Sequence, residues 1–227
     1  MTDIIISTYN RYSYLYKCVW SIIATTKTPY RLIVVDDNST DGTNEFLKDM
    51  KDRGLLIYHR NEKNLGTAKT LNKGISMVKS SWFVMANDDM YFYRGWDIEV
   101  MRISQIPDCG IVTFFDYTRF KFVKTKQIDD KTIKIKSSGL GACFINKKLF
   151  NKAGGFSLPK GKKMGFFASS FCERSLKTNI VKNKHYATVP HYAHHMDLNN
   201  SKMCERKYME NYCKMRTSNK NPNKNKI

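Results

Sequence analysis

The chain has little of the chemistry that marks secreted or membrane-spanning proteins. Its 227 residues include six cysteines, and these form neither a C-x-x-C pair nor the dense framework of a small secreted domain. We therefore expect reduced thiols in a cytosol-like compartment. The first apolar run, Ile4 to Ile6, is far shorter than the apolar part of a signal peptide or a transmembrane helix. These shortages predict a cytoplasmic protein that is soluble or bound peripherally to a membrane.

Acidic residues are scarce beside basic ones. There are 39 Lys and Arg against 20 Asp and Glu, a formal net charge of +19. A surface of this charge concentrates anionic partners such as nucleotide sugars, nucleic acids and the headgroups of an anionic membrane. The basic residues are spread along the whole chain, which is typical of a solvated surface and makes nucleic acid the less favoured partner. A basic nucleic-acid-binding module stays open as an alternative function.

Short β-branched runs alternate with helix-like stretches. Ile4 to Thr8 and Leu32 to Val35 are predicted strands, and Tyr14 to Thr26 between them carries apolar residues at helical spacing. Ser39, Thr40 and Asp41 offer caps for the next helix. Later segments continue the alternation, with strands at 55–59, 82–86, 111–115 and 141–145 and a helix at 67–78. Repeated β-α-β units of this size give an α/β fold with a mostly parallel sheet flanked by helices.

One domain accounts for almost the whole length. We expect it to cover residues 1–215, because a single α/β domain often reaches this size. Within it, Tyr117 to Lys136 is charged and irregular, and forms either a flap or an extra hairpin. Residues 216–227 have no apolar period and are predicted to be a basic disordered tail.

Polar residues follow three of the predicted strands at the point where each ends. They are Ser7 to Arg11, Asp36 to Ser39, and Asn87 to Asp89. The carboxyl ends of parallel strands meet at one edge of a sheet, so these groups should converge. A buried pair of adjacent carboxylates needs a cation or hydrogen-bond donors to stay ionised. Mg²⁺ or Mn²⁺ at Asp88 and Asp89 would meet that need, and a simple turn or helix cap is the alternative.

An ordered set of motifs resembles the family-2 glycosyltransferases of GT-A fold. The motifs are Ile-Ile-Ile-Ser-Thr-Tyr-Asn-Arg at 4–11, Ile-Val-Val-Asp-Asp-Asn-Ser-Thr-Asp-Gly-Thr at 33–43, Asn-Leu-Gly at 64–66, Asn-Lys-Gly-Ile at 72–75 and Asn-Asp-Asp at 87–89. A stretch from Gly141 to Phe156 is similar to the family's acceptor-side segment. Motifs in the right order are more specific than any one of them. The resemblance implies metal-assisted transfer of a sugar, with inversion, from a UDP-sugar to a hydroxyl of a glycan or a lipid-linked acceptor.

The resemblance also implies a donor site, residue by residue. Thr8 and Tyr9 line the base pocket, and Arg11 lies near the phosphates. Asp37 accepts a hydrogen bond from N3 of uracil, supported by Asp36.

The family's Asp-x-Asp motif falls on Asn87-Asp88-Asp89, with Asn in the first position. Asp89 is then the ligand of Mn²⁺ or Mg²⁺, and Asp88 is directed toward the ribose or the donor sugar. The departure at Asn87 is mild, because the metal-binding role belongs to the last carboxylate. Lys69 is a further candidate for stabilising the diphosphate as it leaves.

The catalytic base departs from the family pattern. Family members carry an acidic pair before a Leu-x-x-Arg-like turn, and one of these carboxylates deprotonates the acceptor. Aligning Arg174 with that arginine places Phe167 and Ala168 where the acids should be. Either Glu173 or Asp197 supplies the base, or transfer has been lost and the chain is a donor-binding pseudoenzyme.

Three histidines lie close together near residue 195. In GT-A enzymes a late histidine sometimes completes the metal shell or touches the diphosphate, so His191, His194 and His195 are candidates for either role. Solvated surface histidines are the alternative. A zinc site would use His191 and His195 on one helix face with Cys204, but no second cysteine lies at a usual ligand spacing.

Overall fold

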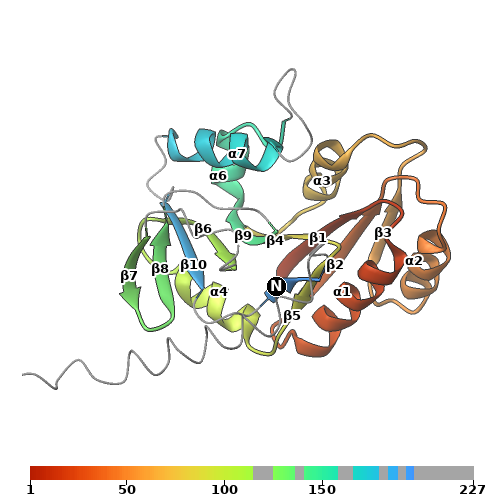
Figure 1. Ribbon diagram of the computed structural model, residues 1–227, viewed down its shortest axis with the longest axis horizontal. Coiled ribbons are helices and arrows are strands. Elements are labelled where there is room, and N and C mark those ends of the chain that lie inside the picture. The colour runs from red at the N-terminus through yellow and green to blue at the C-terminus, as the bar shows by residue number, and fades with distance from the viewer. Residues whose placement is uncertain (115–124, 136–140, 158–165, 179–183, 189–192, 197–227) are drawn as a thin grey trace, which may run out of the picture. The chain divides into compact units, whose positions relative to one another are not determined.

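The computed structural model describes residues 1–114, 125–135, 141–157, 166–178, 184–188 and 193–196 (Figure 1). A nine-stranded sheet has the strand order β3-β2-β1-β4-β9-β6-β10-β8-β7. The strands are β1 (Thr2–Thr8), β2 (Tyr30–Asp36), β3 (Ile57–Arg60), β4 (Trp82–Asn87), β6 (Cys109–Phe114), β7 (Thr125–Asp129), β8 (Thr132–Ile135), β9 (Ala142–Asn146) and β10 (Lys184–Thr188). A separate two-stranded sheet pairs β5 (Met90–Phe92) with β11 (Ala193–His195).

The large sheet is mixed and mostly parallel, which confirms the prediction. Strand β1 is parallel to both β2 and β4, and β2 is parallel to β3. Strand β9 runs antiparallel between β4 and β6, so the chain returns through the middle of the sheet. The hairpin of β7 and β8 lies within the charged segment 117–136, which confirms the hairpin alternative for the described part of that segment.

Helices cover both faces of the sheet (Figure 1). One face carries α1 (Tyr12–Thr25), α2 (Thr43–Asp52) and α4 (Trp96–Ser104), and the other carries α3 (Thr67–Ser76), α6 (Lys147–Lys152) and α7 (Phe166–Leu176). The chain first moves from β1 outward to β3 and then crosses back to β4. Right-handed crossovers in opposite directions put their helices on opposite faces.

Helix α3 packs unusually close to β1 and β2. A Cβ on Gly74 would lie 2.6 Å from Cγ2 of Ile5 and 3.2 Å from Cγ2 of Val35. Glycine therefore lets the helix backbone rest directly on the sheet. The buried cluster beneath α3, α6 and α7 includes Ile5, Phe83, Phe150 and Phe171. This packing fixes the start of α3 beside the carboxyl ends of the central strands.

Residues 1–195 form one compact unit, and the boundary expected at residue 215 lies outside the described residues together with the tail. Cys18, Cys109, Cys143 and Cys172 are buried. In the described part of the chain, no helix combines the length and the apolar character needed to cross a bilayer.

Candidate active site

The centre of the site is the place where the chain order of the sheet reverses. Strand β1 has β2 on one side and β4 on the other, so successive connections leave it in opposite directions. Ligands of open α/β sheets bind in the crevice outside the strand ends at such a point. Ser7 lies opposite Asn87 and Thr8 opposite Asp36 in the strand register. The three polar strand ends predicted from the sequence are therefore neighbours.

A carboxylate pair and an arginine meet at the ends of β1 and β4. Asp88 and Asp89 form the turn between β4 and β5 and are only 6% and 9% exposed. The Thr8 hydroxyl donates to Oδ2 of Asp88 at 2.8 Å. Nε of Arg11 lies 3.2 Å from Oδ1 of Asp88, and its Nη2 donates to Oδ2 of Asp89 at 3.1 Å. The guanidinium also lies 4.8 Å from the ring centroid of Tyr14, a cation–π distance.

The electrostatics of this cluster are dominated by burial. Burial raises the pKa of Asp88 to about 7, against the opposing effects of Arg11 and Thr8 and with a further increase from Asp89. Burial also raises the pKa of the Cys18 thiol, and the charges of Asp88 and Asp89 add to that effect. Arg11 contacts both carboxylates. A cation bound at Asp88 would favour its ionised form.

These residues fit a hard divalent cation. Mg²⁺ and Mn²⁺ prefer oxygen ligands and commonly use one or two carboxylates together with substrate phosphates. Asp88 and Asp89 supply such oxygens at adjacent, buried positions. In the described ranges no group of three or more His, Cys, Asp or Glu side chains is arranged to hold a metal ion. In these ranges the turn thus offers a metal ion the carboxylates of Asp88 and Asp89.

The histidine segment lies beside this turn. On β11, His195 pairs with Met90 and His194 pairs with Tyr91, so the strand runs next to the residue that follows Asp89. The side chains of His194 and His195, and the whole of His191, lie outside the described parts. The zinc alternative was wrong in one respect: His195 is on a strand, so it shares no helix face with His191.

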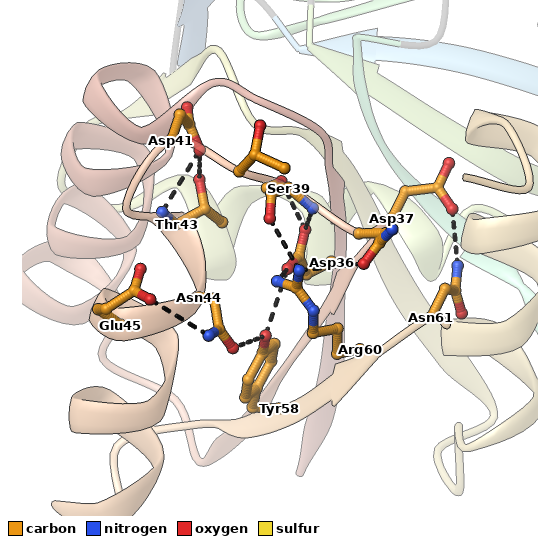
Figure 2. A network of polar contacts seen from close by, with 12 residues as sticks. Asp36, Asp37, Ser39, Asp41, Thr43, Asn44, Glu45, Tyr58, Arg60 and Asn61 are labelled. Carbon is orange, nitrogen blue, oxygen red and sulfur yellow. Dashed lines mark hydrogen bonds and ion pairs between the residues drawn. The ribbon is translucent and has the colours of Figure 1, made fainter. Parts of the chain in front are cut away.

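Asp36 organises the loop after β2 (Figure 2). Its Oδ1 accepts from the backbone N–H of Ser39 at 2.9 Å, and its Oδ2 accepts from Arg60 at 2.5 Å. Tyr58 donates to Asn44 at 2.9 Å and approaches Asp36 at 3.3 Å. Burial raises the pKa of Tyr58 to about 12, so the phenol stays a donor. Asp36 is fully buried and acts on the site through the loop that it holds.

Asp37 points away from Asp36, toward Asn61 (Figure 2). Its carboxylate accepts three hydrogen bonds of 2.8 Å, from Nδ2 of Asn61 and from the backbone N–H groups of Leu65 and Gly66. An ionised carboxylate has about four acceptor positions, so about one is left for a ligand. Asp37 thus fastens the entrance of α3 to the end of β2, and its contact with uracil stays a prediction.

The sequence reasoning missed Arg60 and Asn61. Arg60 is the last residue of β3 and Asn61 follows it, so the same strand-end argument applied to β1, β2 and β4 would have found them. The nearby loops are also joined: the backbone N–H of Asn10 donates to Oγ of Ser39 at 2.9 Å, and Asn10 has a φ of 51°. Asparagine tolerates this left-handed conformation better than most residues do.

Two predicted donor residues are exposed. Tyr9, at the end of β1, is 46% exposed and is available to a flat ligand such as a base. Lys69 is exposed on the first turn of α3. Neither side chain is fixed by the cluster around Asp88, and their roles stay predictions.

On the acceptor side, Arg174 is a structural anchor. Its Nε donates to the carbonyl of Ala153 at 2.8 Å, and its Nη2 donates to the carbonyl of Gly155. Asn72 pairs with both the N–H and the carbonyl of Phe156, at 3.0 and 2.6 Å. These contacts hold the loop after α6 between α3 and α7.

The structure describes one of the two candidates for the catalytic base. Glu173 is exposed on α7. It lies five residues after position 168, where the family acid would fall, which is about 140° around a helix of 3.6 residues per turn. Asp197 lies outside the described residues. The base therefore stays unassigned between them.

Comparison with known proteins identifies the family. Residues 3–176 match glycosyl transferase family 2, which is most of the chain. The chain belongs to this family. A curated relative, the glycosyltransferase GlyG of Streptococcus pneumoniae serotype 4, is 31% identical over 91 residues, which are 39% of this chain and 30% of that protein. The chain thus spans less than a third of this relative's length.

Solved structures show the same fold. The mannosyltransferase PcManGT from Pyrobaculum calidifontis, in complex with GDP-Man and Mn²⁺, superposes with a TM-score of 0.63 and 17% identity, over 81% of this chain and 53% of that one. S. aureus TarS in complex with UDP gives a TM-score of 0.65 and 16% identity, over 85% and 60% of the two chains. The GT-A fold predicted from the sequence is confirmed.

Proposed function

We propose that the chain transfers a sugar from a UDP-sugar to an acceptor hydroxyl, with inversion and with the help of Mn²⁺ or Mg²⁺. The observation that carries this proposal is the meeting of Thr8, Arg11, Asp88 and Asp89 at the ends of β1 and β4. Family membership supports sugar transfer. The GDP-Man and Mn²⁺ of the PcManGT complex and the UDP of the TarS complex support a nucleotide donor and a metal.

The donor would lie across the switch point. The uracil ring of the donor packs against Tyr9, and its N3–H reaches the remaining acceptor position of Asp37. The diphosphate of the donor lies toward Arg11 and Lys69. Thymine shares the N3–H of uracil, so the contact at Asp37 alone does not separate these two bases.

The proposed reaction depends on stabilising the negative charge of the leaving group. An acceptor oxygen attacks the anomeric carbon, and the nucleoside diphosphate leaves from the opposite face with the bonding electrons. Arg11 and Lys69 stabilise the negative charge that gathers on the leaving group. Asp89 would hold a divalent ion, which would supply Lewis-acid stabilisation of the same charge.

The acceptor must lose its proton to a base. Glu173 and Asp197 are the two candidates for this role. Both a glycan and a lipid-linked molecule remain candidate acceptors.

A donor-binding pseudoenzyme is a second candidate function. Residues 167 and 168 are Phe and Ala, and the one acidic residue in the α7 sequence, Glu173, is exposed. Such a protein would bind a nucleotide sugar through the same residues without passing the sugar on.

A ligand-binding panel tests these alternatives. Thermal stability is measured with UDP- and GDP-sugars, each with Mn²⁺ or with EDTA, because a ligand that binds only the folded state raises its stability. We expect a Mn²⁺-dependent increase with a UDP-sugar. Release of UDP is then measured with and without glycan and lipid-linked acceptors. Acceptor-stimulated release supports transfer, hydrolysis alone supports the pseudoenzyme, and no nucleotide sugar raising the stability contradicts both.

A further inference from the structure

Arg11 already occupies the place where a cation is needed. Its guanidinium contacts Asp88 through Nε at 3.2 Å and Asp89 through Nη2 at 3.1 Å. The arginine side chain is one-third exposed, whereas those of the two aspartates are 9% and 12% exposed. A partly exposed guanidinium thus faces two buried carboxyl groups.

We propose that Arg11 is the resident counter-cation of Asp88 and Asp89, and that a divalent ion binds tightly at Asp89 only after a nucleoside diphosphate has drawn the guanidinium away. This inference rests on the proposed function. It adds an order of binding, in which the nucleotide completes the metal site.

The guanidinium and the metal ion compete for the same carboxylates. Nη2 of Arg11 uses Oδ2 of Asp89, one of the two oxygens that this carboxylate offers to a metal. Opposite charges attract and like charges repel more strongly in a poorly solvated pocket than in water. A divalent ion placed on Asp89 beside the guanidinium therefore meets a repulsion that no further anion in the pair offsets.

A diphosphate removes this conflict. Its oxygens match the planar fork of an arginine, which binds phosphate through two parallel hydrogen bonds. It also brings its own negative charge, so the guanidinium and the metal ion each face a separate anion. Arg11 is the N-cap residue of α1 and follows the end of β1 by three positions, and its partial exposure leaves the side chain room to turn toward a ligand.

Binding of the metal and of the diphosphate must then be coupled in both directions. If the nucleotide raises the affinity for metal, the metal raises the affinity for nucleotide by the same factor. Removing the guanidinium should reduce this coupling, because it raises the affinity for metal in the absence of nucleotide.

The test is Mn²⁺ binding by the full chain, measured from the electron paramagnetic resonance signal of free Mn²⁺. Wild-type protein and Arg11→Gln are titrated alone, with UDP and with GDP. For wild type we expect weak binding alone and about tenfold tighter binding with one of the nucleotides, within the usual range for coupled sites. Arg11→Gln should bind Mn²⁺ about tenfold more tightly than wild type without nucleotide, with a smaller further gain from UDP or GDP.

Two variants control for charge and folding. Arg53→Gln makes the same change in an exposed pair with Asp49 on α2, and should bind Mn²⁺ as wild type does. Arg11→Lys keeps the positive charge but loses the fork, so it should fall between wild type and Arg11→Gln. It also serves as the test variant if the glutamine protein fails to fold, as judged by circular dichroism.

The outcomes separate the two proposals. If wild type and both Arg11 variants bind Mn²⁺ equally well without nucleotide, the proposed role of Arg11 is overturned. If UDP still tightens Mn²⁺ binding in all three proteins, the proposed function stands. Absence of Mn²⁺ binding in every variant, with or without either nucleotide, overturns the metal part of the proposed function and this inference with it.

Discussion

The donor side and the acceptor side of the domain are built by different means. On the donor side, at the ends of β1 to β4, buried carboxylates are each held by named donors, as Asp36, Asp37 and Asp88 show. On the acceptor side, α7 packs through Phe171 and Cys172 into the apolar core. The donor half thus presents hydrogen-bonded charged side chains to a nucleotide, whereas the acceptor half is held by the packing of apolar side chains.

This difference explains where the family pattern is kept and where it changes. Under the proposed function, the donor site needs carboxylates and an arginine at the strand ends to hold a metal and a diphosphate. The helix α7 on the acceptor side contributes to packing. Arg174 illustrates this, because it serves the carbonyls of Ala153 and Gly155 and contributes to the loop.

The largest expected effect concerns the base. Either Glu173→Gln or Asp197→Asn should lower transfer about 10²- to 10⁴-fold, the usual contribution of general base catalysis, and leave UDP binding unchanged. The other variant should change transfer by about twofold or less. Transfer rates measured with both variants decide which residue is the base. Full transfer by both variants would exclude both candidates.

Asp89→Ala should cause the second-largest loss of activity. We expect turnover with Mn²⁺ to fall about 10²- to 10³-fold, since the leaving diphosphate loses its electrostatic support. Asp49→Ala, an exposed carboxylate on α2, is the control and should retain activity. Initial rates with and without Mn²⁺ measure the effect, and undiminished Mn²⁺-dependent turnover in Asp89→Ala would remove the metal assignment.

The acceptor half should be the part that is sensitive to mild acid. His185 on β10 is fully buried, its Nε2 lies 2.9 Å from Oγ of Ser175, and its Nδ1 has no hydrogen-bond partner in the described ranges. Burial, together with the smaller effect of the Lys184 charge, lowers the pKa of His185 to about 4. The pKa of His185 in the folded protein lies below the ordinary value of 6.5, so folding favours the neutral imidazole. The free energy of unfolding is therefore highest above pH 6.5 and decreases as the pH falls toward 4.

The expected loss in the free energy of unfolding is about 3 kcal/mol between those two pH values. Urea titrations at a series of pH values measure it. His185→Gln keeps a polar side chain near Ser175 without titrating in this range. A pH profile identical in wild type and His185→Gln would show that His185 contributes nothing to the acid sensitivity.

Asp37→Ala should have the smallest effect on binding. Losing the acceptor for N3–H should weaken UDP binding by about 1 to 3 kcal/mol. The same change frees the N–H groups of Leu65 and Gly66, so stability should fall as well. Calorimetric titration with UDP, at a temperature where the variant is folded, separates the two effects. Equal UDP affinity in both proteins would make Asp37 a purely structural residue of the donor half.

Much of the donor half could be predicted from the sequence. Hydrophobic periodicity placed the strands around Ile5, Val34 and Val84, and strand-end polarity pointed to Asp88 and Asp89. The helix caps were harder. Ser39 bonds to Asp36, and Gly42 occupies the N-cap position of α2, because the loop is shaped by long-range contacts from β3 as well as by local capping.

What the sequence by itself determined is the order of elements and the chemical type of the site, since both follow from local patterns of apolar residues and strand-end carboxylates. Only the tertiary structure decided which charges meet. Arg11 reaches Asp89 across 78 positions of sequence, and Arg60 reaches Asp36 from a neighbouring strand. Such contacts depend on strand order and helix packing, which bring distant residues within hydrogen-bond distance only after the sheet has formed.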